Sequence, residues 1–301
     1  MKRKVIQLAD TTQSITIPRT WALFNNLQKG EFVEVEEHGN LLLVRADREN
    51  NSEIEIDLTD LTKDLSWRYL VTSYRKGAKT INIKFRDKRE LKIIQDLVKD
   101  LLGMVIVKQD KNKLIMKDMF SNSKADIDDS LKKIFALLID LSKDSFEAIK
   151  NNDKLSIENI PYQDFNINKF ANLSVRLLNV FGYRERNKTN SIYKIISVLE
   201  EIGDEYRRLS LVYSRLGNKV SRNTLDCFEM VNNLLLNYHD LYYNFGREEA
   251  KQFYKYAGDA LEKIKESYEK GNSTDVQILS SLDTILHLIK NLAEENMVVN
   301  L

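Results

Sequence analysis

The stretch IYKIISVLEEIGDEYRRLSLVYSRL, residues 192–216, places apolar residues three or four positions apart along most of its length. Because an α-helix has about 3.6 residues per turn, this spacing predicts a helix with one apolar face. The apolar stripe is made of Ile192, Ile195, Ile196, Leu199, Ile202, Tyr206, Leu209 and Leu216. We therefore expect this helix to pack against neighbouring helices along that face.

The same period continues on both sides of this helix, from Asp126 almost to the end of the chain. Short polar or glycine-containing breaks, such as Asn151-Asn152-Asp153 and Gly217-Asn218, divide it into six segments. The six predicted helices cover residues of about 126–151, 160–185, 190–216, 222–244, 246–270 and 274–298. Helices joined by short loops pack antiparallel, which predicts one or two three-helix bundles.

A weak internal repeat links the third and sixth of these helices. Their sequences align without gaps, and the aligned pairs are Leu199 with Leu282, Ile202 with Ile285, and Leu209 with Leu292. The stretch Leu199-Glu200-Glu201-Ile202-Gly203-Asp204 resembles the helix signature of the PhoU family, whose members are phosphate-signalling regulators. The resemblance implies a PhoU-like helical domain over residues 124–301, with three-helix repeats at about 124–217 and 220–299.

The PhoU resemblance also implies a metal site. In that family an acidic pair four residues apart joins carboxylates of the neighbouring helix, and side chains at i and i+4 share one helical face. The corresponding ligands in this chain would be Glu200, Asp204, Asp283, His287 and Asp164. The implied cofactor is a divalent or ferric metal ion, and ordinary solvated helix faces are the alternative interpretation of the same residues.

The preceding helix departs from the family pattern at two positions. Asn166 and Asn168 stand where the family has carboxylates. An asparagine offers a neutral oxygen, which is a weaker ligand for a transition metal than a carboxylate. The sequence therefore predicts a weakened metal site.

Short strands and helices alternate over residues 53–119. The predicted strands cover residues 54–58, 80–85, 104–108 and 113–117, and the predicted helices cover residues 61–74 and 87–102. This βαβαββ order predicts a small two-layer α/β domain. The segment contains neither a glycine-rich phosphate loop nor an obvious group of catalytic residues.

The first 48 residues favour strands around one short helix. The predicted strands cover residues 5–8, 14–18, 32–36 and 41–44, with a helix that begins at Pro18 and a turn at His38-Gly39-Asn40. The ordered set resembles the AbrB/SpoVT swapped-hairpin family in three segments, Ser14–Trp21, Leu27–Glu31 and Val33–Val35. The resemblance implies a DNA-binding domain at residues 1–48 that interleaves with a second copy, because so short a segment buries little core alone.

Charge is unevenly distributed in this first segment. Residues 1–30 contain five basic residues and one acidic residue, which favours contact with nucleic-acid phosphates. The candidate DNA-binding residues are Lys2, Arg3, Lys4 and Arg19 for phosphates, and Thr12, Gln13 and Ser14 for base edges. Ordinary solvation of the basic residues and turn formation by the polar residues are the alternatives.

The composition narrows the class of protein. The net charge is +1, and no apolar stretch approaches the roughly 20 residues that a membrane span needs. Cys227 is the only cysteine, so no internal disulfide forms, which is typical of a reducing cytoplasm. With three histidines and no nucleophile–base pair in the sequence pattern, we expect a cytoplasmic protein without membrane insertion that is not an enzyme.

The complete order of a swapped-hairpin domain, an α/β domain and PhoU-like helices resembles archaeal-type phosphate uptake regulators, and the predicted fold class is multidomain α+β. The resemblance implies a homodimeric transcriptional regulator of phosphate uptake that binds double-stranded promoter DNA. The alternative is an adaptor that regulates a phosphate transporter or its signalling proteins by protein contact, with the hairpin used only for dimerisation. A third interpretation is an antitoxin-like protein that regulates its own gene, and the long helical region argues against it.

Overall fold

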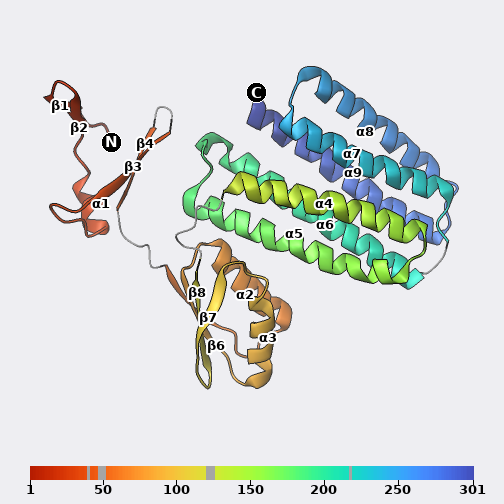
Figure 1. Ribbon diagram of the computed structural model, residues 1–301, viewed down its shortest axis with the longest axis horizontal. Helices are drawn as coiled ribbons and strands as arrows, with labels where there is room; N and C mark the ends of the chain where they lie inside the picture. Colours follow the sequence, from red (N-terminus) through yellow and green to blue (C-terminus); the bar gives the residue numbers. More distant parts are fainter. Residues whose placement is uncertain (39–40, 47–51, 120–125, 217–218) are drawn as a thin grey trace. The chain divides into compact units, whose positions relative to one another are not determined.

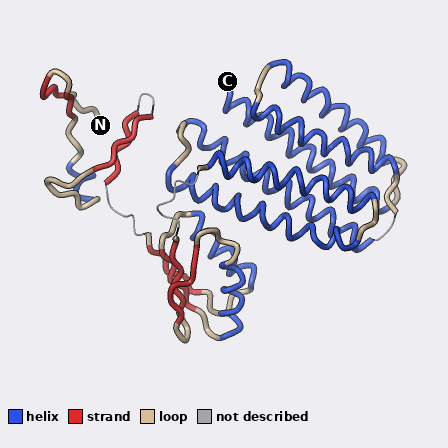
Figure 2. Tube along the Cα trace, in the orientation of Figure 1, coloured by secondary structure: helices blue, strands red, loops and turns tan. Residues whose placement is uncertain are grey.

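The computed structural model describes the whole chain except residues 39–40, 47–51, 120–125 and 217–218 (Figure 1). The chain forms two compact units, Met1–Asn50 and Asn51–Leu301, and each is described by itself. All strands among the described residues precede the six long helices, as Figure 2 shows. This arrangement confirms the predicted α+β class.

The first unit contains two separate antiparallel strand pairs and one short helix. Its elements are β1 Ile6–Ala9, β2 Thr12–Ser14, α1 Arg19–Phe24, β3 Val33–His38 and β4 Leu41–Ala46. β1 pairs with β2, and β3 pairs with β4, which is the hairpin that the sequence predicts. Residues 39–40 of the predicted turn lie outside the described residues.

The predicted strand at residues 14–18 is wrong over most of its length. β2 ends at Ser14, where it meets Ile6 at the start of β1, so residues 15–17 extend beyond the end of their partner strand. Alternation of apolar and polar residues favours a strand only where a neighbouring strand supplies hydrogen bonds. Pro18 instead precedes α1 as its N-cap residue.

The first unit has no buried core among its described residues. Its larger apolar side chains are open to solvent, with Phe24 87%, Phe32 82% and Leu8 70% exposed. Two-stranded hairpins are marginally stable without an apolar face that is covered. Pairing of this segment with a second copy stays a prediction.

The second unit begins with a two-layer α/β fold. Its elements are β5 Glu53–Asp57, α2 Lys63–Arg75, β6 Thr80–Lys84, α3 Lys88–Val98, β7 Met104–Gln109 and β8 Lys113–Asp118. The strand order is β5-β6-β8-β7; β5 and β6 run parallel and the other pairs antiparallel. α2 and α3 cover one face of this sheet (Figure 1). The βαβαββ order is the predicted one.

The core of this α/β fold is formed by apolar residues that alternate with more exposed residues along the strands. Ile81 and Ile83 on β6, and Leu114 and Met116 on β8, point to the helix-covered face and are buried. The residues between them, such as Asn82, are more exposed. One apolar face per strand is what a sheet covered on one side requires.

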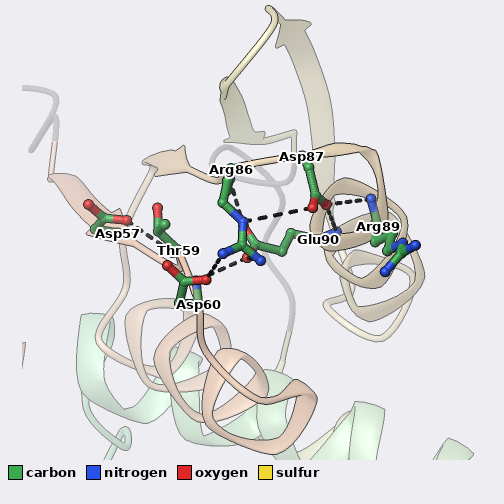
Figure 3. A network of polar contacts seen from close by, with 7 residues as sticks. All are labelled: Asp57, Thr59, Asp60, Arg86, Asp87, Arg89 and Glu90. Atoms are coloured by element: carbon green, nitrogen blue, oxygen red, sulfur yellow. Dashed lines mark hydrogen bonds and ion pairs between the residues drawn. The ribbon is translucent and has the colours of Figure 1, made fainter.

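A polar network joins the two loops that follow the parallel strands β5 and β6 (Figure 3). The Glu90 carboxylate accepts hydrogen bonds from the backbone N–H groups of Asp60, at 3.0 Å, and Arg86, at 2.6 Å. The Arg86 side chain forms an ion pair with Asp60, whose φ of 61° is left-handed. The network fixes the backbone at the ends of β5 and β6 and leads into α3.

Six α-helices and a short 3-10 helix, Arg186–Lys188, make up most of the described remainder of the second unit. The α-helices are α4 Ile127–Lys150, α5 Lys154–Phe181, α6 Thr189–Leu216, α7 Arg222–Tyr243, α8 Arg247–Tyr268 and α9 Ser273–Asn300. The prediction that the second of them starts at residue 160 is wrong, because Asp153 caps α5 and Pro161 lies inside it. The predicted break at Gly217-Asn218 lies outside the described residues.

The helices form two groups of three, α4–α6 and α7–α9, that meet mainly where α6 packs against α9. Leu199, Ile202 and Leu209 on α6 are fully buried, and so are Leu282, Ile285 and Leu292 on α9. These are the residue pairs that the internal repeat aligns. The two copies therefore occupy equivalent core positions.

The predicted separation of residues 53–119 from residues 124–301 stays a prediction, because both segments belong to the second compact unit. Among the described helices, none combines the length and the hydropathy that crossing a membrane requires.

Candidate functional site

An acidic site lies between α5 and α6, and a glycine makes room for it. Asp164 on α5 is 2% exposed. A Cβ atom at Gly203 on α6 would lie 2.9 Å from Asp164 Oδ1 and 3.3 Å from Ile167 Cδ1. Gly203 therefore lets α6 approach the Asp164 carboxylate more closely than a larger residue would.

Arg207 bridges the carboxylates of this site. Its Nε lies 2.8 Å from Asp164 Oδ2, and its Nη2 lies 2.6 Å from Asp204 Oδ1. The Asn168 amide donates a further hydrogen bond of 3.3 Å to Asp164 Oδ2. The Arg207 guanidinium on α6 thus pairs with one carboxylate of α5 and one carboxylate of its own helix.

Two carboxyl groups of this site are harder to ionise than free ones, although Arg207 is close to one of them. Burial raises the pKa of Asp164 to about 7; Asp204 and Glu200 add to the rise, and Arg207 opposes it. Burial also raises the pKa of Glu200, with Asp204 as the next cause. We call Asp164, Glu200, Asp204 and Arg207 the acidic site.

Arginines from the α/β fold reach the same region. Arg75 and Arg68 on α2 lower the pKa of Glu200 and so oppose the effect of burial. The Arg75 Nε donates a hydrogen bond of 2.6 Å to Asn172 Oδ1 on α5. The α/β fold therefore supplies positive charge next to the acidic site.

The α/β fold is held on α5 by Arg176, a buried arginine. Arg176 donates to the backbone carbonyls of Tyr74, at 2.7 Å, and Ala78, at 3.0 Å. It also forms an ion pair of 2.6 Å with Asp118 at the end of β8, and its guanidinium carbon lies 4.8 Å from the Tyr74 ring centre. These contacts fix α2 and β8 against α5.

The second predicted pair, Asp283 and His287, lies on α9. His287 Nδ1 is 2.8 Å from the Asp283 backbone oxygen and 3.5 Å from Asp283 Oδ1. Both side chains are partly exposed, and no group of three His, Cys, Asp or Glu side chains in the described part of the chain includes them as metal ligands. Metal ligation by this pair stays a prediction.

The acidic site does not fit a metal ion in its present arrangement. No three His, Cys, Asp or Glu side chains within the described ranges are grouped as a metal-ligand set. Arg207 takes up one oxygen each of Asp164 and Asp204, and Asn166 is exposed. Ligation by Asp164, Glu200, Asp204, Asp283 and His287 stays a prediction without a matching geometry.

The sequence analysis missed Arg207, Arg75 and Arg176. Arg207 lies three residues after Asp204, a spacing that places both on one helical face and could have indicated their ion pair. The positions of Arg75 and Arg176 depend on how α2 packs on α5, which no local pattern encodes.

The predicted DNA-binding residues lie in the first unit. Lys2, Arg3 and Lys4 are exposed in the segment before β1, and Arg19 is the exposed first residue of α1. Thr12 and Gln13 are exposed on β2. The Ser14 hydroxyl donates a hydrogen bond of 3.4 Å to the Ile6 carbonyl. Strand pairing brings β2 beside β1, and DNA contact stays a prediction.

Comparison with known proteins gives one structural similarity. No protein-family model matches the chain, and no curated protein matches it. The chain is similar to the crystal structure of the phosphate transport system regulatory protein PhoU from Streptococcus pneumoniae, with a TM-score of 0.46 and 16% identity. The similarity covers 58% of this chain and 93% of that one, and it assigns no residue role to this chain.

Proposed function

We propose that the chain is a non-enzymatic regulator of phosphate uptake that acts by binding a phosphate transporter or one of its signalling proteins. The observation that carries the proposal is the repetition in the helical region. Two groups of three helices meet at α6 and α9, and the aligned core residues of the two copies are fully buried. The resemblance of Leu199–Asp204 to the PhoU helix signature supplies the link to phosphate.

The surface of α5 supports protein contact. Leu155 is 79% exposed, Tyr162 is 73% exposed and Phe165 is 37% exposed. Residues seven and ten positions apart lie close to one face of a helix, and we call these three side chains the apolar strip. The exposed Glu158 and Asn159 lie between Leu155 and Tyr162 on this face. Exposed apolar side chains flanked by polar residues are typical of protein interaction surfaces.

The test is phosphate uptake in cells of the native host that lack the gene. We expect uptake under plentiful phosphate to change on deletion and to be restored by the wild-type chain. Tyr162→Glu should fail to restore it, because a charge interrupts the apolar strip. As a control, Lys255→Glu on the exposed face of α8 should restore uptake fully. Unchanged uptake on deletion would contradict the proposal.

A second candidate function is transcriptional regulation through the first unit. The observation that favours it is the exposure of Lys2, Arg3, Lys4 and Arg19. Electrophoretic mobility with the chain's own promoter tests it, since phosphate contacts weaken strongly as salt increases. Binding that is lost when all four residues become glutamine would support this function. If that variant also restores phosphate uptake, the adaptor function is favoured.

A further inference from the structure

We propose that Arg207 is the resident cation of the acidic site between α5 and α6, and that this site holds no metal ion in the native chain. The proposal starts from contact geometry. Arg207 reaches Asp164 on the facing helix at 2.8 Å and Asp204 on its own helix at 2.6 Å. A guanidinium offers several donors in one plane, which suits it to bridge two carboxylates.

Burial explains why the site needs a cation. Asp164 has a side chain that is 2% exposed, whereas the Arg207 side chain is 39% exposed and brings its charge in from the surface. A buried carboxylate is strongly destabilising unless a positive charge or hydrogen bonds compensate it. Arg207 provides both to Asp164 Oδ2, whereas Asp164 Oδ1 is buried without a hydrogen-bond partner among the described residues.

The other carboxylate of the site also has positive neighbours. Arg75 and Arg68 of α2 act on Glu200. The site therefore has arginines from two elements, Arg207 on α6 and Arg75 and Arg68 on α2, close to its carboxylates. A divalent or ferric ion would have to displace Arg207 from Asp164 and Asp204.

The amide ligands point to the same conclusion. Asn168 presents its N–H group, not its oxygen, to Asp164. A metal ligand must present an oxygen lone pair to the ion. Asn168 acts here as a second donor to the carboxylate, in the same sense as Arg207.

The first test measures metal in the purified full-length chain. The wild-type chain is equilibrated with Mn²⁺, Zn²⁺ or Fe³⁺ in turn and analysed by elemental mass spectrometry and calorimetry beside Glu200→Gln and Asp204→Asn. We expect no bound metal that depends on either residue. About one equivalent in the wild-type chain that either variant loses would overturn the proposal.

The second test measures unfolding of variants by denaturant in metal-free buffer. Arg208→Met is the matched control, because Arg208 lies next to Arg207 on α6 and pairs with Glu205 while 54% exposed. We expect Arg207→Met to lower the unfolding midpoint by at least about twice as much as Arg208→Met. Arg207→Lys should lower the unfolding midpoint less than Arg207→Met does, because lysine keeps the positive charge but cannot contact Asp164 and Asp204 at the same time.

A double-mutant comparison separates charge compensation from simple packing. In an Asp164→Asn background, Arg207→Met should lower the unfolding midpoint by less than it does in the wild-type background, since the buried carboxylate is gone. An equal loss in both backgrounds would overturn the proposal, as would a loss no larger than that of Arg208→Met. If Arg207→Met alone does not fold, folding of the double variant supports the proposal and its failure to fold contradicts it. These readouts do not depend on the proposed function.

Discussion

Asp164 combines burial with negative charge, and this combination makes its protonation depend on folding. The folded chain holds the Asp164 proton up to a pH of about 7, because the pKa is raised from 3.8 mainly by burial. The unfolded chain releases the same proton near its ordinary pKa. The stabilising effect of proton uptake is therefore complete below about pH 4 and is lost as the pH rises through about 7.

Asp164→Asn should remove this pH dependence. The difference between 3.8 and about 7 corresponds to at most about 4 kcal/mol of the free energy of unfolding between acidic and neutral pH. Denaturant unfolding across this pH range should give a flatter profile for the variant than for the wild-type chain. Asp140→Asn, at an exposed position of α4, is the control and should keep the wild-type profile. Parallel profiles for Asp164→Asn and the wild-type chain would show that Asp164 titrates normally.

Gly203 offers a second test at a single residue. Alanine is a better helix former than glycine by about 1 kcal/mol, so a Gly→Ala change on an open helix surface stabilises. At Gly203 the added Cβ would lie 2.9 Å from Asp164 Oδ1, so we expect Gly203→Ala to lower the melting temperature. Gly258→Ala on α8 meets nothing within 4 Å and should raise it. The opposite order of the two variants would mean that α5 and α6 do not approach closely here.

At this scale the sequence and the family resemblance predict three of the four residues of the acidic site. The spacing of Glu200 and Asp204 places two carboxylates on one helical face, and the family resemblance adds Asp164. Neither indicates that Arg207 reaches across to Asp164, because that contact depends on the distance between α5 and α6. The same dependence on packing hides the role of Gly203, which sequence alone presents as a weak position in a helix.

Among the elements, α5 shows where local patterns fail. The sequence pattern predicts a helix that begins at about residue 160, whereas Pro161 lies inside α5. The Asp153 side chain instead accepts hydrogen bonds from the backbone N–H groups of Leu155 and Ser156, so the helix starts at Lys154. Other helix boundaries agree more closely with the prediction, because polar or glycine breaks coincide with chain reversals.

Arg176 is the residue by which α5 holds the α/β fold. Arg176→Met should destabilise the second unit by about 3 kcal/mol or more, because it removes the hydrogen bonds to the Tyr74 and Ala78 carbonyls and the buried ion pair with Asp118. Denaturant unfolding measures the loss, and hydrogen exchange should show it in α2 and β8. Arg222→Met is the control, since Arg222 is 93% exposed and its carboxylate partner lies 4.0 Å away. Equal stability of the two variants would contradict the role given to Arg176.

For the whole molecule, the resemblance of the first unit to swapped-hairpin domains leads us to propose a dimer, and the exposed Phe32 and Leu8 side chains support it. We expect the full-length chain to sediment at twice its mass of 35.1 kDa. Phe32→Ser together with Leu8→Ser should weaken the dimer, because both side chains are exposed within one copy and would be covered by a second. Leu155→Ser in the second unit should leave sedimentation unchanged. A monomeric wild-type chain at micromolar concentration would refute this assembly.

The ion pair between Arg207 and Asp164 also has an evolutionary consequence. A lineage that replaces Arg207 with a neutral residue leaves a buried carboxylate uncompensated, so the order of substitutions matters. Asp164 or Asp204 must change first, or a new cation must appear nearby. Homologous chains that have lost the arginine should therefore also lack at least one of the two aspartates or carry another cation nearby. Selection at these positions would act on the pair, and each substitution would be tolerated only against the right background.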